Sequence, residues 1–133
     1  MLFHDVPLTC INQAALQYHV PATMILSIIK IENGRNGLAV KNSNGTYDLG
    51  VMQINSSWIS KLENKGITAS QVKYDPCVNV SVGAWILAQG IANGEGWKGV
   101  GNYHSYTTKH NFVYREKVKK TFNNYVSILE MMA

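Results

Sequence analysis

The chain has 133 residues, of which 46% are hydrophobic, and its formal net charge is +4. This size suits one compact domain with a hydrophobic core, so we expect a single domain over residues 1–133. No run of about 20 apolar residues is present, and the sequence therefore predicts no membrane span. The basic charge suits an anionic partner, which could be nucleic acid, an acidic lipid surface or a carboxylate-rich cell-wall polymer.

The N-terminal residues lack the basic and apolar regions of a signal peptide, so the chain is either cytoplasmic or a mature form without its leader. Cys10 and Cys77 are too few for a four-cysteine metal site and too far apart for a CxxC motif. As a disulfide they would stabilise the fold by roughly 4 kcal/mol in the chain-entropy model and indicate an oxidising compartment. The alternative is two separate buried thiols.

Two helices are predicted near the N-terminus. The first covers residues 7–19 and begins after Asp5 and Pro7, with apolar positions at Leu8, Ile11, Ala15 and Leu16. Pro21 begins the second, whose apolar run from Met24 to Ile31 ends at Glu32.

Glu32 is a candidate general acid because of this position. Burial disfavours a charged carboxylate, and so does the partial negative charge at a helix C-terminus, so both raise its pKa. The alternative is a glutamate that reaches the surface where the helix ends.

The middle of the chain is predicted to be largely irregular. Residues 33–50 hold four glycines and four asparagines, which is typical of an ordered functional loop, and residues 51–54 form a short strand at most. Asn55 can cap a helix that ends at Glu63, with Trp58, Ile59 and Leu62 as its buried stripe.

The second half is predicted to hold two longer helices. Asp75 and Pro76 are a strong start signal for a helix toward Gln89, which should be central because it is apolar on most sides. Residues 90–101 are glycine-rich and predicted to be irregular. The last helix, over residues 108–131, is expected to bury Phe112, Val118, Phe122, Tyr125 and Leu129. Its basic segment, residues 115–120, is read as a solvated helix face rather than a nucleic-acid site.

Few other residues suggest chemistry by themselves. Asp48 has an ordinary explanation as a turn former, and Met52 as core packing, whereas the amide of Gln53 must find hydrogen-bond partners between two apolar neighbours. The four histidines lack the spacing of metal ligands, and we expect neither a metal nor a cofactor. The motifs of serine hydrolases, P-loop proteins and zinc fingers are missing from the sequence.

Three blocks of sequence then point to a family. They are Ile-Glu-Asn-Gly at residues 31–34, the run from Asn42 to Asn55 with Gly-Val-Met-Gln-Ile-Asn at its end, and Gly-Asn-Tyr-His-Ser at residues 101–105. In this order they resemble the soluble lytic transglycosylases of the goose-type lysozyme superfamily. The small members that accompany type IV secretion, type III secretion, conjugation and pilus systems are especially similar.

The resemblance implies a mainly α, lysozyme-like transglycosylase (SLT) domain with a substrate groove and at most a minimal β element. It makes Glu32 the single catalytic acid, with Tyr103 beside the catalytic carboxyl and Tyr114 as a further family tyrosine before Lys117 and Val118. Substrate-binding positions are expected at Asp48, Gly50, Met52, Gln53, Asn55, Tyr103, His104 and Tyr114. Asn33, Val51 and His104 depart from the common family residues, and the first and third could alter substrate positioning.

The implied reaction cleaves the β-1,4 bond between N-acetylmuramic acid and N-acetylglucosamine and forms a 1,6-anhydro ring without net hydrolysis. Three alternatives stay open. Asp48 could activate water in a lysozyme-type hydrolase if it faces Glu32 across the groove at an inverting distance. The domain could instead be a non-catalytic glycan-binding assembly module. A basic nucleic-acid-binding domain rests on charge alone, so we expect no nucleic-acid partner.

The expected partners are peptidoglycan glycan strands and a secretion, conjugation or pilus component. The implied location is periplasmic or exported.

Overall fold

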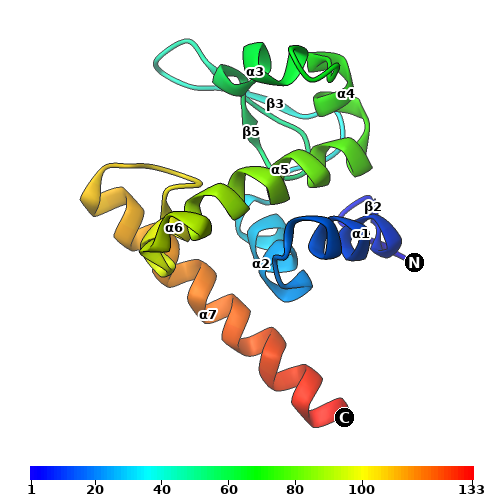
Figure 1. The fold of residues 1–133 in the computed structure, drawn as a ribbon, viewed down its shortest axis with the longest axis vertical. Helices are drawn as coiled ribbons and strands as arrows, with labels where there is room; N and C mark the ends of the chain where they lie inside the picture. The colour runs from blue at the N-terminus through cyan, green and yellow to red at the C-terminus, as the bar shows by residue number, and fades with distance from the viewer.

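The computed structural model describes residues 1–133, apart from the exposure of Gly94. Helices dominate, with two small antiparallel sheets, as expected (Figure 1). Among the described residues, no helix is both long and apolar enough to cross a membrane.

The N-terminal part consists of a two-stranded sheet and two helices. Strands β1 (Leu2–Phe3) and β2 (Val6–Pro7) precede α1 (Leu8–Tyr18) and α2 (Ala22–Glu32). A proline stands at the N-cap of each helix, and Asp5 does not cap α1. Ile11 and Ala14 of α1 are buried in the core. Leu16, which was predicted to lie on the apolar face of this helix, is 78% exposed.

A three-stranded sheet occupies much of the segment that was predicted to be irregular. Its strands are β3 (Ala39–Lys41), β4 (Tyr47–Leu49) and β5 (Ile54–Asn55), paired antiparallel in the order β3-β4-β5. The strands have two or three residues, and all of β3 is exposed, so no alternation of apolar and polar residues was long enough to predict them. Residues 51–53, where a short strand was allowed, form the turn before β5 instead.

Short helices follow the sheet. Asn55 caps the turn η1 (Ser56–Trp58) by accepting a hydrogen bond from the Ser57 amide, and α3 (Ile59–Glu63) continues it, as predicted. Helix α4 (Ala69–Tyr74) was missed, although Thr68 and Gln71 form a capping box at its start.

Helix α5 (Pro76–Gly90) lies at the centre of the fold, as predicted, and packs against α1, α2, α4 and α6. The Asp75 side chain caps it by accepting from the amides of Cys77 and Val78. Cys10 of α1 and Cys77 of α5 form a disulfide with a Cα–Cα distance of 5.3 Å, which confirms the predicted pairing.

The glycine-rich segment after α5 is helical rather than irregular. It forms a π-helical turn, η2 (Ile91–Glu95), and α6 (Trp97–Gly101). A Cβ at Gly90 would overlap the Gly99 carbonyl, and the reverse holds at Gly99. The glycines therefore allow α5 and α6 to approach closely; the weak helix propensity of glycine made the prediction wrong here.

Helix α7 (Thr108–Met132) is the last element, close to the predicted range. Its buried stripe is Asn111, Tyr114 and Val118. The predicted stripe was partly wrong, because Phe112 and Leu129 are exposed and Phe122 and Tyr125 only half-buried. The first half of α7 packs on α6 and α2, and its end projects away from the other helices (Figure 1).

Candidate functional site

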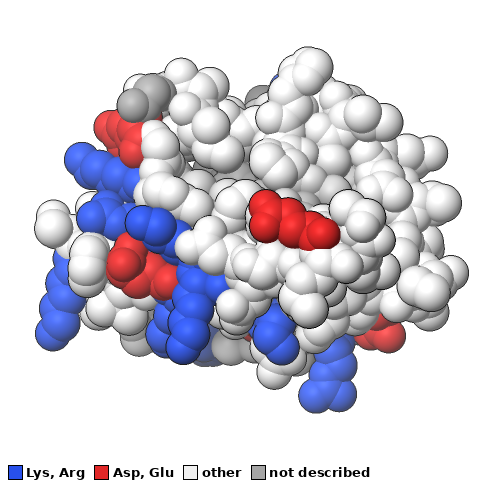
Figure 2. All heavy atoms as spheres, turned by 90° about the horizontal axis from the view of Figure 1, so that it is seen from below, with Lys and Arg blue, Asp and Glu red and all other residues white. Residues whose placement is uncertain are grey.

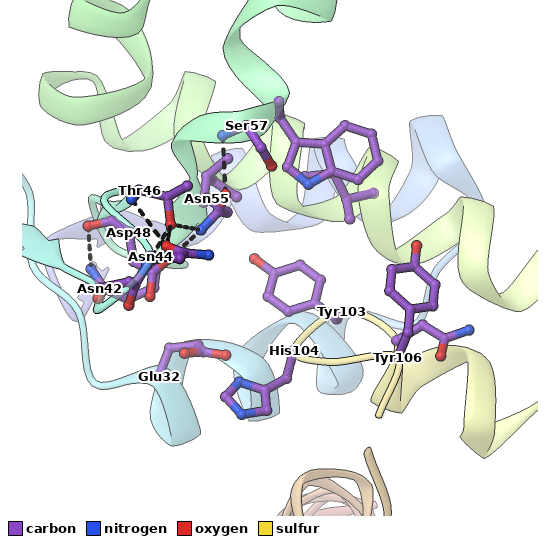
Figure 3. Close-up of a pocket in the computed structure, with 15 residues that line it drawn as sticks. Glu32, Asn42, Asn44, Thr46, Asp48, Asn55, Ser57, Tyr103, His104 and Tyr106 are labelled. Atoms are coloured by element: carbon purple, nitrogen blue, oxygen red, sulfur yellow. Dashed lines mark hydrogen bonds between the residues drawn. The ribbon is translucent and has the colours of Figure 1, made fainter. Parts of the chain in front are cut away.

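A cavity of about 340 Å³ separates the three-stranded sheet from the helical part. It lies between the end of α2 and the loop after α6, with α5 behind it (Figure 3). Its lining residues are Glu32, Asn42, Asn44, Thr46, Asp48, Gln53, Ile54, Asn55, Ser57, Trp58, Ile86, Asn102, Tyr103, His104 and Tyr106.

Glu32 is the last residue of α2 and lies partly buried at one side of this cavity. Asn33 ends the helix in a left-handed conformation, with φ of 52°, so the chain turns away directly after the carboxyl group. In Figure 3 the carboxyl of Glu32 and the rings of Tyr103 and His104 border the same space. Tyr114 donates a hydrogen bond of 2.8 Å from its hydroxyl to Glu32 Oε2.

The pKa of Glu32 is raised from its ordinary value of 4.5 to about 7. Burial is the largest cause, and the negative charge of Asp48 raises the pKa further, while the hydrogen bond from Tyr114 lowers it. A carboxyl group with this pKa holds a proton through much of the neutral range and can also release it. That is the property required of a general acid that later acts as a base.

Asp48 belongs to β4 and not to a turn, which corrects the turn-forming interpretation. Its Oδ1 accepts hydrogen bonds from the amide groups of Asn42 at 3.1 Å and Asn55 at 3.0 Å. Both amides also donate to the hydroxyl of Thr46, which donates to Asn44 Oδ1 at 2.7 Å. The sheet and the turn that joins β3 to β4 therefore present a connected polar wall to the cavity, and Asp48 is part of it (Figure 3).

A buried side chain of α5 holds the turn between β4 and β5 in place. Asn79 is buried, and its side chain accepts from the Met52 amide and donates to the carbonyls of Leu49 and Val72. Gly50 takes φ of 70°, a left-handed conformation that suits glycine. Gln53 Nε2 donates to the Gly50 carbonyl at 2.9 Å, which supplies the partner that its amide was expected to need.

Tyr103 connects this turn to the opposite wall. Its hydroxyl donates to the Met52 carbonyl at 2.7 Å, across 51 residues of sequence. Burial, with the charges of Glu32 and then Asp48, keeps the pKa of Tyr103 well above its ordinary value, so the hydroxyl remains a donor. Met52 itself is fully buried, and its side chain packs in the core.

A second buried asparagine holds the loop that carries Tyr103 and His104. Asn111 of α7 donates to the carbonyls of Lys98 and Ser105 and to Asn102 Oδ1, at 2.8 to 3.0 Å. Asn79 and Asn111 thus position the two walls of the cavity from helices behind them. Neither was singled out from the sequence, because a buried asparagine within a helical run gives no local signal of its distant partners.

His104 borders the main cavity and also contacts Tyr114, which lies on the other side of Glu32. Their rings stack with centroids 4.8 Å apart and an interplanar angle of 12°. Partial burial lowers the pKa of His104, Asp48 opposes this change, and the neighbouring His110 and Lys117 add to it. Burial, together with Glu32 and Tyr103, raises the pKa of Tyr114, so its hydroxyl stays available as a donor to Glu32.

The structure thus brings most of the predicted residues together. Those that line the main cavity are Glu32, Asp48, Gln53, Asn55, Tyr103 and His104. Gly50 and Met52 do not line it but support the turn beneath it, and Tyr114 contacts Glu32 from the far side. The lining residues that were not predicted to be functional are Asn42, Asn44, Thr46, Ile54, Ser57, Trp58, Ile86, Asn102 and Tyr106.

The polar lining offers no evident metal centre. Among the residues that the structure describes, no group of three or more His, Cys, Asp or Glu side chains is placed to hold a metal ion.

Fold and site together define a mainly helical, lysozyme-like domain whose groove lies between a small sheet and a helical body. The profile of the transglycosylase SLT domain matches residues 9–126, and the chain belongs to this family. Members of the family are typically lytic transglycosylases, which act on peptidoglycan.

Individual relatives agree with this assignment. The chain is similar to Invasion protein IagB of Salmonella typhi, with 34% identity over 127 residues, which cover 93% of this chain and 79% of the relative. It is 33% identical over 101 residues to Protein IpgF of Shigella sonnei, covering 74% of this chain and 66% of the relative. A Peptidoglycan-binding-like protein of Escherichia coli O157:H7 is 27% identical over 105 residues, covering 72% and 63%.

Proposed function

We propose that this protein, acting as one domain over residues 1–133, is a peptidoglycan lytic transglycosylase with Glu32 as its only catalytic acid. The observation that carries the proposal is the Glu32 carboxyl, with a pKa of about 7, at the side of a polar groove in an SLT domain. The bond cleaved is the β-1,4 linkage from N-acetylmuramic acid to N-acetylglucosamine.

The protonated Glu32 donates its proton to the glycosidic oxygen as the bond from that oxygen to C1 of the muramoyl residue breaks. The resulting carboxylate then accepts the proton of the muramoyl C6 hydroxyl, whose oxygen bonds to C1 and closes the 1,6-anhydro ring. Glu32 ends protonated as it began, and no water is consumed.

The surroundings of Glu32 support both steps. Burial favours the protonated acid before cleavage, and the Tyr114 hydroxyl stabilises the carboxylate formed afterwards. Tyr103 and the amide-rich wall around Asp48 offer donors and acceptors of the kind that hydroxyl and acetamido groups of a glycan require.

Asp48 favours one alternative, a lysozyme-type hydrolase. It lines the same cavity as Glu32 and its charge acts on Glu32, so it could activate a water molecule. In our proposal Asp48 does not activate water; it accepts hydrogen bonds from two amide groups and forms part of the polar wall of the cavity. A glycan-binding module without activity is the other alternative, and the raised pKa of Glu32 argues against it.

Two substitutions test the assignment. Glu32→Gln keeps the shape of the side chain but cannot donate the proton, so turnover of purified peptidoglycan should fall below detection. Asp48→Asn keeps one acceptor oxygen for its two amide partners, and it should still release product. Loss of turnover in Asp48→Asn with an intact fold, or turnover in Glu32→Gln, would contradict the proposed roles.

We further propose a periplasmic or exported location and a role in opening the wall locally for a secretion, conjugation or pilus apparatus. The disulfide is of a kind that persists in oxidising compartments. Similarity to an invasion protein supports the role. Affinity purification from an envelope extract should recover a component of such an apparatus, and recovery of none would count against the partner.

A further inference from the structure

A second cavity, of about 240 Å³, lies on the side of Glu32 away from the sheet. Glu32 and His104 line both cavities, so the groove continues past the carboxyl group toward the first half of α7. The remaining walls are Ile31 of α2 and, from α7, residues 110, 113, 114 and 117.

The two cavities differ in charge. Asp48 and Glu32 are the charged residues among those that line the main cavity, and the rest of that lining is neutral or histidine. The second cavity has Lys117 and His110 on α7, with Glu32 as its only lining acid among the described residues. Figure 2 shows the molecule from below, where Lys and Arg side chains gather toward the left with acidic side chains among them.

His110 and Lys117 both act on His104, which shares the cavity with them. Burial is the main cause that lowers the pKa of His104, and His110 and Lys117 lower it further. A positive potential at this cavity attracts a carboxylate but does little for the binding of a neutral sugar. Ile31 and Val113 add apolar surface beside Lys117 and His110.

We propose that this second cavity binds the peptide stem of the muramoyl residue next to the cleaved bond, with Lys117 and His110 at a stem carboxylate. The inference rests on the proposed function, since it assigns the neighbouring part of the same substrate. A stem of short amino acids offers both features that the cavity matches: methyl groups for Ile31 and Val113, and free carboxylates for the ammonium group of Lys117 and the imidazole N–H of His110.

Binding is measured by calorimetry on the Glu32→Gln protein, which does not need to cleave. The ligands are a tetrasaccharide of alternating N-acetylglucosamine and N-acetylmuramic acid with its stem peptides, and the same tetrasaccharide with each lactyl carboxyl capped as a neutral methylamide in place of the stem. We expect the stem-bearing ligand to bind about tenfold more tightly. Equal affinity for the two ligands would overturn the inference.

Lys117→Gln and His110→Gln, each added to Glu32→Gln, should remove most of that tenfold difference and leave affinity for the stem-free ligand unchanged. Lys120→Gln is the matched control, because Lys120 is an exposed lysine of α7 that lines neither cavity. All three positions are exposed, so the variants should fold. An equal loss for both ligands, or the same loss in the Lys120 variant, would contradict a stem site.

A short poly(glycerol phosphate) provides a further arm. If it displaces the stem-bearing ligand as well as the free stem peptide does, the cavity is a general anion site and the inference fails. Failure of the proposed function is recognised separately, as absence of turnover in the wild-type protein on stem-bearing and stem-free strands alike.

Discussion

The raised pKa of Glu32 predicts that this single residue makes the stability of the fold depend on pH. Its pKa is about 7 in the folded protein against an ordinary 4.5, so between these values the folded protein holds a proton that the unfolded chain has released. Stability therefore falls as pH rises through this range, because the folded state binds more protons than the unfolded state. The contribution is fully present below pH 4.5 and lost above about pH 7.

The size of the effect follows from the same two values. At roughly 1.4 kcal/mol for each pH unit, moving the pKa from 4.5 to about 7 costs the fold about 3 kcal/mol once Glu32 is ionised. Glu32→Gln removes the titration while keeping the shape of the side chain. The difference in unfolding free energy between the variant and the wild type should therefore shift by about 3 kcal/mol toward the variant between pH 4.5 and pH 8.

Urea denaturation at several pH values measures this difference, with the three tryptophans as fluorescent reporters and the disulfide kept oxidised. Other titrating groups are common to both proteins and cancel in the comparison. Glu130→Gln provides the control, because it removes the same charge from an exposed position near the end of α7. A difference between Glu32→Gln and the wild type that stays constant with pH would refute the account of Glu32.

Three further predictions concern the groups around Glu32 and the frame that holds them. In the wild type, kcat/KM should decline above about pH 7 as the acid loses its proton. Tyr114→Phe removes the hydrogen bond that stabilises the Glu32 carboxylate, so the pKa of Glu32 should rise and the decline should move up by about one pH unit. A decline in the variant at the same or a lower pH would contradict this. Replacing Cys10 and Cys77 by serine should lower the unfolding free energy by up to about 4 kcal/mol in urea titrations, and unchanged stability would refute this. Gly34→Ala should destabilise the fold by about 1–3 kcal/mol and reduce turnover, because its Cβ would overlap backbone carbonyls of the turn after β4; wild-type stability and activity would disprove that packing.

Structural features that depend on neighbouring residues were predicted well from the sequence. Asp75 and Pro76 mark the start of α5 because a capping carboxylate and a proline act within one helical turn. The end of α2 at Glu32 was equally readable, since an apolar run stops there and glycine follows. Burial of Glu32, which the apolar run before it suggested, is the largest cause of its raised pKa, whereas the contributions of Tyr114 and Asp48 come from distant parts of the chain.

What the sequence could not predict depends on distant partners. The hydrogen bond from Tyr114 to Glu32 joins residues 82 positions apart, and the Tyr103 bond to Met52 joins residues 51 apart. The strands β3 and β4 are too short for alternation to show, and their pairing is what defines them. The helix at residues 97–101 forms against glycine propensity because close packing on Gly90 favours it.

The most direct test of the central claim is mass spectrometry of the muropeptides that the wild-type protein releases from purified peptidoglycan. The account predicts products that end in 1,6-anhydro-muramic acid, because Glu32 delivers the C6 hydroxyl and no water to C1. Products with a reducing muramic acid, heavier by one water, would contradict it and assign Asp48 the activation of water.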